Sequence, residues 1–313
     1  MPTRKAPRKG SLQFWPRKRA SKFLPRVNWN AISPNSKGLK GFICYKAGMV
    51  SVIIKNKTPN SMTKDKKIAI PATILEIPPM KIFSIRFYKN KKVVTEILAD
   101  NFEKELKKKL KLPKKKSKAF EDIKDYDDLG IIAYSLVKRT NIKKTPDLAE
   151  IGLVGTIEEK INYVKEILGK EINFENVFEK GQLVDFRGIT TGRGFQGPVK
   201  RFGVTLRQHK SEKGVRKVGS IGPWHPARVT FRVPMAGQMG LFTRVSYNKK
   251  IIDFGKSENK FNSIKNYGDI KTNYVLVEGS IQGPSKRQLI ITSPLRATKK
   301  QKKKDYEFLE VVR

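Results

Sequence analysis

Residues 188–244 constrain this chain more than any other stretch, because they combine Gly-rich turns, scattered Lys and Arg, and one tryptophan flanked by prolines. Between positions 181 and 250 the sequence holds fourteen Lys or Arg residues against two acidic residues, Asp185 and Glu212. Cations at this density repel one another unless counter-charges lie close by. We therefore expect a long segment that cannot fold onto itself alone and that requires an anionic partner.

The whole chain of 313 residues carries a net charge of +39, which indicates a phosphate-bearing partner, most simply nucleic acid. An anionic membrane is the rival interpretation. No window approaches the roughly 18 apolar residues of a spanning helix, and the N-terminus MPTRKAPRKG lacks the apolar core of a signal peptide. We expect a cytosolic protein of one large or two moderate domains, with no membrane partner.

The charge excess is unevenly distributed. From Glu96 to Glu179 there are seventeen acidic and seventeen basic residues, so the remainder holds 67 − 17 = 50 basic and 28 − 17 = 11 acidic residues. The first forty residues carry eleven Lys or Arg, no acidic residue, and Trp15 and Trp29. Such a tract should stay disordered or extended until RNA neutralises it. The balanced segment should behave as an ordinary folded insertion that contributes little to RNA binding.

Short β-branched and aromatic runs predict strands on both sides of the balanced segment. Before it they cover residues 42–45, 49–55, 68–77, 81–88 and 91–98, and after it residues 182–190, 227–234, 243–248, 251–255, 274–281 and 287–293. Inside it, residues 102–111 and 156–170 look helical and residues 131–139 look like a strand, while Lys114 to Lys116 suit a solvated loop. Thr156 and Glu159 form a capping-box pattern.

This pattern predicts an α+β fold in which one β domain is interrupted by an insertion. We divide the chain into a basic N-terminal extension (1–40), a first β part (41–95), a mixed α/β insertion (96–179), a second β part (180–298) that includes the central loop 188–244, and a basic C-terminal tail (299–313). The single cysteine, Cys44, lies in an apolar run and should be a small buried side chain.

Gly192, Gly194 and Gly197 spell G-x-G-x-x-G, the fingerprint of a dinucleotide site. That site requires a helix that opens at the last glycine, and we expect none, because Pro198 follows and the next residues lack a helical period. A glycine turn without a ligand is a second interpretation. We favour a third, in which the backbone approaches a phosphate chain closely because no side chain blocks it.

Trp224 lies in the sequence I-G-P-W-H-P-A-R, where Gly and Pro argue against a strand. A tryptophan is more often part of a core, but a rigid basic loop favours one that stacks on nucleobases. The two histidines, His209 and His225, have no Cys or carboxylate at ligand spacing, so we expect no metal site. The basic tract also lacks a nucleophile–base pair. We expect no catalytic residue, no cofactor and no small-molecule substrate.

The motifs are similar to those of the universal large-subunit ribosomal protein family L-three, in its archaeal or eukaryotic form. The matching stretches include GSLQFWPRKRASKFLPRV, VFEKGQLVDFRGITTGRGFQGPVKRFGV, KGVRKVGSIGPWHPARV and YVLVEGSIQGPSKRQLI, and with others they cover most of the chain in family order. The family's eukaryotic members have a histidine shortly before the G-x-R-K run; here KSEK separates His209 from that run.

The resemblance implies a translation-protein-type β-barrel interrupted by an α/β insertion, with a basic N-terminal extension and a long central loop that penetrates ribosomal RNA. It implies a structural protein that binds 23S-type rRNA and neighbouring large-subunit proteins, acts early in assembly, and places Trp224 near the peptidyl-transferase centre. General nucleic-acid compaction and RNA modification are the alternatives. The residues expected to bind rRNA are Arg17, Lys18, Arg19, Arg193, Gly194, Phe195, Gly197, Lys200, Arg201, His209, Lys213, Arg216, Lys217, Trp224, His225, Arg228, Gln238 and Arg244.

Overall fold

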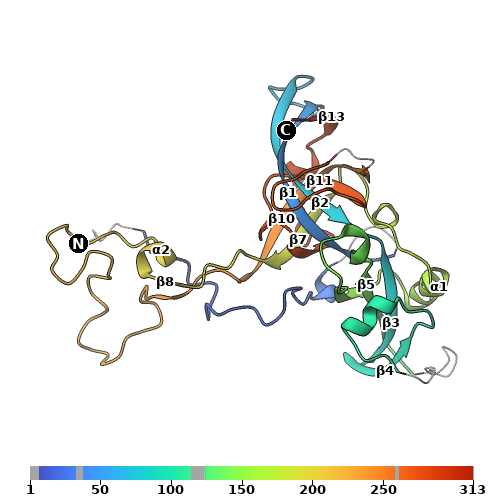
Figure 1. The fold of residues 1–313 in the computed structure, drawn as a ribbon, viewed down its shortest axis with the longest axis horizontal. Coiled ribbons are helices and arrows are strands. Elements are labelled where there is room, and N and C mark those ends of the chain that lie inside the picture. Colours follow the sequence, from blue (N-terminus) through green and yellow to red (C-terminus); the bar gives the residue numbers. More distant parts are fainter. Residues whose placement is uncertain (1–6, 33–37, 114–122, 124, 258–260, 313) are drawn as a thin grey trace. The chain divides into compact units, whose positions relative to one another are not determined.

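Most of the regular secondary structure is β-strand, and the helices are few and short (Figure 1). The computed structural model describes residues 7–32, 38–113, 123, 125–257 and 261–312. Its contacts divide the chain into two compact units. We call residues 1–22 with 189–243 the loop unit, and residues 23–188 with 244–313 the sheet unit.

The larger sheet of the sheet unit has seven strands, in the order β12-β7-β10-β11-β2-β1-β13. Their bounds are β1 Gly41–Asn56, β2 Lys67–Ile77, β7 Leu183–Ile189, β10 Thr243–Lys256, β11 Asn273–Glu278, β12 Gln288–Thr292 and β13 Tyr306–Val312. Strand β12 also pairs with β1, so the hydrogen-bonded order returns to its starting strand. The β-branched and aromatic residues that predict these strands fit a pleated, half-buried surface.

Strand β1 is long enough to pair with different partners along its length. Residues 41–45 pair antiparallel with β12, whereas residues 51–56 pair antiparallel with β13. The segment predicted as a basic tail therefore contains a strand of the large sheet, preceded by the short helix α3 (Lys299–Lys302). The basic run and the apolar run at the C-terminal end of the sequence belong to different elements.

A four-stranded antiparallel sheet has the order β4-β3-β5-β6, with β3 Met80–Lys89, β4 Lys92–Leu98, β5 Asp128–Ser135 and β6 Leu148–Gly152. It combines β3 of the first β part and β4, which crosses the predicted boundary at residue 95, with two strands from the balanced segment. Helix α1 (Ile157–Ile167) begins with the predicted capping box, because the Thr156 side chain accepts from Glu159 N and the Glu159 side chain accepts from Thr156 N. This prediction is confirmed.

One apolar core is shared by both sheets and α1. Phe42 of β1 packs edge-on against Phe174 at 5.7 Å, and Phe174 stacks on Phe178 at 5.1 Å. Phe174 lies in the 3-10 turn η5 (Phe174–Asn176). Cys44 is fully buried in this core as predicted, and burial raises the pKa of its thiol well above the ordinary value.

Three expectations about local structure are wrong. Residues 227–234 contain no strand: Pro226 and Pro234 bound this run, and its mostly exposed side chains have no pairing partner in the described chain. Residues 102–111 form the 3-10 turn η2 (Lys104–Lys108) instead of a longer helix. The predicted strand at 131–139 ends at Ser135 and continues as the 3-10 turn η4 (Val137–Thr140). Lys114 to Lys116 lie outside the described residues.

The N-terminal tract packs against the rest of the protein in the absence of RNA. Its residues 7–32 contain only the 3-10 turn η1 (Trp29–Ala31), yet they contact other parts of the protein. Trp29 packs against the core of the sheet unit, and its ring leaves no room for a side chain at Gly41 or Gly152. The expectation of an unpacked tract fails because its tryptophans supply apolar contacts that the charge count ignores.

Candidate RNA interface

The loop unit begins as a pair of antiparallel segments. Thr190 N donates to Phe242 O at 3.0 Å, and Arg193 N donates to Met239 O at 2.9 Å. The short strands β8 (Phe195–Gln196) and β9 (Gly237–Gln238) continue this ladder. A side chain at Gly240 would lie 2.0 Å from Thr191 O, and φ is +77° there, so only glycine fits.

A short helix, α2 (Pro198–Phe202), follows Gly197 directly, so the expectation of no helix at this point is wrong. Proline suits the first helical position because its missing N–H is not needed there, and Gly203 ends the helix in the left-handed conformation at φ +68°. The helix has one turn, and β8 pairs antiparallel with β9. A dinucleotide site requires a parallel strand–helix–strand unit, which is not what these residues form.

Arg201 holds the returning segment of the loop against α2. Its Nε donates to Gln238 O at 2.9 Å, and its Nη1 donates to Met235 O at 2.9 Å. The guanidinium also fills the space beside Gly237, where a Cβ would lie 3.0 Å from the Arg201 Cζ. Partial burial lowers the pKa of Arg201 from its ordinary value. Lys200, next to it, is exposed.

The N-terminal segment packs within the same unit. Trp15 stacks on Phe202 at 6.4 Å and meets Phe231 edge-on at 5.5 Å. The Arg17 guanidinium lies over the Phe202 ring, 4.2 Å from its centroid. Arg8 donates to Arg232 O, and Ala20 N donates to Leu241 O at 2.9 Å. Residues 7–22 of the N-terminal extension and the central loop therefore form one structural element.

Trp224 is 88% exposed in the segment of the loop unit that connects α2 to β9. All the residues from Gly219 to Val229 are exposed, so no core packs against the indole. Arg207 organises the preceding segment, because its Nη2 donates to Val218 O and to Gly219 O. The indole thus lies exposed on an irregular loop, and the segment before it is held by hydrogen bonds from the Arg207 side chain to backbone carbonyls.

Electrostatic compensation is missing in the loop unit. Residues 1–22 hold eight Lys or Arg, residues 189–243 hold ten, and Glu212 is the single acidic residue of both ranges. Glu212 makes no ion pair with any described residue, whereas Arg86, Arg139 and Lys160 of the sheet unit all pair with carboxylates. The loop unit therefore carries a positive charge that its own residues do not neutralise.

Most of the predicted residues lie on the loop unit and are exposed. The exposed ones are Lys18, Arg19, Arg193, Gly194, Phe195, Gly197, Lys200, His209, Lys213, Arg216, Lys217, Trp224, His225 and Arg228. Arg17, Arg201 and Gln238 are half-buried in contacts within the loop unit. Arg244 belongs to the sheet unit, and partial burial lowers its pKa.

Arg8, Phe202 and Arg207 were not predicted. Their partners are residues distant in the chain or backbone carbonyls. Contacts of these kinds produce no spacing pattern in the sequence. The glycine at position 237, where a Cβ would lie 3.0 Å from the Arg201 Cζ, is a sequence signal that another group approaches the backbone closely there.

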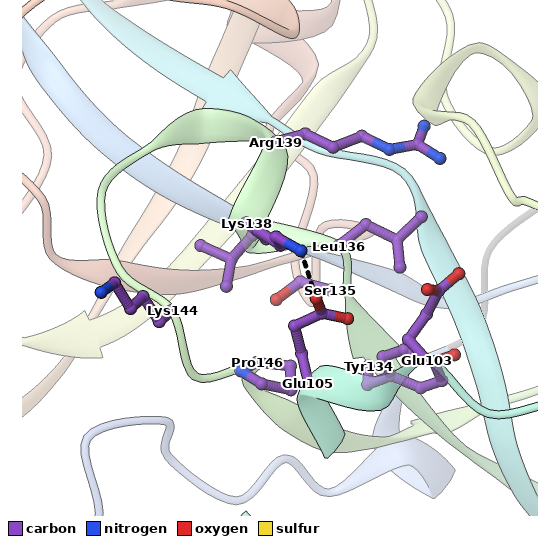
Figure 2. Close-up of a pocket in the computed structure, with 10 residues that line it drawn as sticks. Glu103, Glu105, Tyr134, Ser135, Leu136, Lys138, Arg139, Lys144 and Pro146 are labelled. Carbon is purple, nitrogen blue, oxygen red and sulfur yellow. Dashed lines mark hydrogen bonds and ion pairs between the residues drawn. The ribbon is translucent and has the colours of Figure 1, made fainter. Parts of the chain in front are cut away.

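The sheet unit contains a cavity of about 370 Å³ between η2 and the end of β5 (Figure 2). Its carboxylates are engaged: Lys138 Nζ lies 2.5 Å from Glu105 Oε1, and Lys81 Nζ lies 2.7 Å from Glu103 Oε1. Burial raises the pKa of Tyr134 to about 12, so its hydroxyl stays neutral at pH 7. The two glutamates are thus held in ion pairs with lysines and are not arranged as bases beside a nucleophile.

Within the described residues, no three His, Cys, Asp or Glu side chains gather as a metal site would require. Among the described helices, none has the length and apolar character needed to cross a bilayer.

Comparison with known proteins gives one consistent result. The family model described as ribosomal protein L3 matches residues 1–311. The chain is 44% identical over 308 residues to the large ribosomal subunit protein uL3 of Methanocaldococcus jannaschii, covering 93% of this chain and 91% of the relative. It is 40% identical over 315 residues to the protein of the same name from Methanobrevibacter smithii, covering 94% of this chain and 93% of the relative.

Proposed function

The chain belongs to the ribosomal protein L3 family, and on that premise we propose that it is a structural component of the large ribosomal subunit that binds 23S-type rRNA. It carries out this role in the cytoplasm, in contact with neighbouring large-subunit proteins. It supports early subunit assembly by ordering RNA segments around its loop unit. Nothing in the comparisons favours an RNA-modifying enzyme or a compaction protein.

One observation carries the proposal: the loop unit has an ordered backbone but no internal counter-charge. The loop unit has eighteen Lys or Arg residues and one acidic residue, and most of the described cationic side chains are exposed. Phosphates along folded RNA supply negative charge at regular spacing. The aromatic contacts of Trp15 and the carbonyl contacts of Arg201 order the loop unit before binding, which lowers the entropy cost of association.

Phosphate contacts position a protein on RNA, and A-form grooves hide most base edges. We therefore infer that the shape of the rRNA, more than its base sequence, selects the binding site. Trp224 is the exception in the set, because an indole stacks on bases and donates one N–H but has no group suited to acid–base chemistry. We place it near the peptidyl-transferase centre, where it holds RNA geometry.

The proposed scaffold is a translation-protein-type β-barrel interrupted by an α/β insertion. Two features support this: the large sheet returns to its starting strand through the β12–β1 pairing, and a separate four-stranded sheet includes β5 and β6. A closed sheet leaves few free edges. Such a scaffold would carry the loop unit on β7 and β10, the strands that lead into it and out of it.

Gradient sedimentation of cell extract tests the function directly. The chain should sediment with the large subunit and remain there after a moderate salt wash. Purified chain should also bind structured large-subunit rRNA in preference to duplex DNA of equal length. Absence from the large-subunit peak would refute the proposal, and equal binding of duplex DNA would favour the compaction protein.

A further inference from the structure

The hairpin that joins β1 to β2 presents an ordered, cationic tip on the sheet unit. Pairing ends at Lys55 and Lys67, and the residues between them form two turns. The side chain of Met62 at this tip is 97% exposed, more than Trp224 at 88%. Single exposed apolar residues are common on protein surfaces. The exposure of Met62 therefore indicates a binding site only if the turn that carries it has a fixed conformation.

Asn56 holds the tip in place from a buried position. Its Nδ2 donates to Thr63 Oγ1 at 2.8 Å and to Ser61 Oγ at 3.1 Å, on the two sides of Met62. Its Oδ1 accepts from Thr58 N at 3.0 Å. Asn56 itself is 5% exposed. The turn that carries Met62 is therefore fixed by one buried side chain, and its conformation exists before any partner binds.

Residues at the start of the C-terminal strand β13 and just before it bind Lys57 and Thr58, on the N-terminal side of the tip. Lys57 N donates to Asp305 O at 2.9 Å, and Lys57 Nζ lies 3.0 Å from Glu307 Oε2. Asp305 N donates to Thr58 Oγ1 at 3.0 Å. Lys57 is thus paired within the protein, whereas the lysines that follow Met62 are not part of these contacts.

Lys64, Lys66 and Lys67 follow Met62 and are all exposed. None of the three forms an ion pair with a described residue, and Asp65 is the single acidic residue between Asn56 and Lys67. Lysine is a point charge with a flexible stem and suits phosphate contacts of varied geometry. Apolar side chains such as Met act as wedges at base steps in nucleic acids, and folded RNA offers unstacked bases.

We propose that this hairpin tip, residues 56–67, is a second RNA-binding element, separate from the loop unit. Met62 packs against an accessible base or base step, and Lys64, Lys66 and Lys67 contact the flanking phosphates. Asn56 is the positioning residue that holds the turn. The inference rests on the proposed function, because the RNA concerned is the rRNA that the whole chain binds.

A triple substitution tests the charge contacts. The full chain with Lys64→Gln, Lys66→Gln and Lys67→Gln is titrated with large-subunit rRNA over a range of KCl concentrations. Each lost phosphate contact reduces the salt slope of log affinity by about 0.7 to 0.9, so the loss of three contacts should lower the slope by about 2 to 3. The matched control, Lys107→Gln with Lys108→Gln and Lys109→Gln, removes the same charge from exposed lysines of the charge-balanced segment and should keep the wild-type slope. Equal slopes for the two triple variants overturn the inference.

Met62→Cys tests the position. The native Cys44 is fully buried, so a thiol-reactive iron chelate attaches selectively at residue 62. Local cleavage of rRNA in reconstituted subunits is expected, and labelled wild-type chain should give none. A benzophenone on the same cysteine should capture RNA; capture of protein alone would overturn the inference in favour of a protein contact.

Failure of the two proposals is distinguishable. If the wild-type chain does not bind large-subunit rRNA, the proposed function is refuted and the inference with it. If the wild-type chain binds but neither the slope nor the cleavage depends on the hairpin, only the inference is refuted.

Discussion

The indole of Trp15 stacks on the ring of Phe202 with centroids 6.4 Å apart and planes 23° apart, which joins the N-terminal segment to the central loop. Phe202 is buried and is the last residue of the short helix α2. Phe231 packs edge-on against the same Trp15 indole. A segment that would otherwise repel its neighbour by charge is thus held by aromatic contacts. The loop unit is ordered through this small cluster.

Trp15→Ala should loosen the loop unit without unfolding the sheet unit. Two aromatic contacts are lost, each of about 0.5 to 1.5 kcal/mol beyond the area buried. Hydrogen exchange followed by mass spectrometry should show faster exchange in residues 189–243 and unchanged exchange in β1 and β2. Phe195→Ala is the control, because Phe195 is 77% exposed and supports little packing. Unchanged exchange in the Trp15 variant would contradict the assignment.

Arg201→Gln and Lys200→Gln remove the same charge from adjacent residues but should act differently. Arg201 donates to the half-buried carbonyl of Gln238 and to the exposed carbonyl of Met235, so its loss leaves the Gln238 carbonyl without this donor, at about 1 to 3 kcal/mol for a buried group left unsatisfied. Limited proteolysis should then cut the loop more readily. Lys200→Gln should leave proteolysis unchanged and lower the salt slope of rRNA binding by about 0.7 to 0.9. Identical behaviour of the two variants would refute this division of roles.

Trp224→Ala should leave incorporation into subunits nearly intact while it alters peptide-bond formation. One base stack is worth about 1 to 3 kcal/mol, which is small beside many phosphate contacts. Purified subunits that carry the substitution are compared with wild type for protein occupancy by mass spectrometry and for puromycin reactivity. Full occupancy with wild-type reactivity would show that the exposed indole has no such role.

Phe174→Ala should destabilise the sheet unit as a whole. Phe174 is 1% exposed and packs against Phe42, Phe178 and Phe254, so truncation should cost about 3 to 5 kcal/mol. The segment with balanced charge therefore contributes to stability even if it contributes little to RNA binding. Thermal unfolding of the full chain measures the effect, and a variant with wild-type stability would show that the shared core is not cooperative.

The buried carboxylate of Glu76 should make stability depend on pH. Burial raises its pKa, although Thr272 N, Lys271 N and the Tyr267 hydroxyl donate to it. A raised pKa in the folded state means that the unfolded state releases the proton first as pH rises. The contribution of Glu76 to the free energy of unfolding therefore falls from about pH 4.5 upward, until the folded-state group has also ionised.

Glu76→Gln should remove this dependence, because an amide oxygen still accepts from the backbone donors but does not titrate. Denaturant unfolding of both proteins between about pH 4 and pH 7 measures the difference, which should favour the variant progressively as pH rises. A difference that stays constant over this range would show that Glu76 does not titrate in it.

Local sequence predicted the features that depend on neighbouring residues. The strands follow from runs such as residues 68–77, and the start of α1 follows from Thr156 and Glu159, because side-chain alternation and capping act over a few residues. The charge partition located the segments that lack carboxylates, since charge is a property of composition. The same local reasoning failed at α2, where proline at the first helical position was taken as a reason against a helix.

The amino-acid sequence by itself determined most of the strands of this protein, the cap at the start of α1 and the segments that lack their own counter-charge. Tertiary structure alone decided that Trp15 meets Phe202, that β13 pairs with β1, and that Arg201 holds carbonyls while Lys200 stays exposed. The physical reason is range: propensity and capping are set within a few residues, whereas packing joins groups that chain order does not relate. Each of these long-range contacts depends on the fold that the other contacts create.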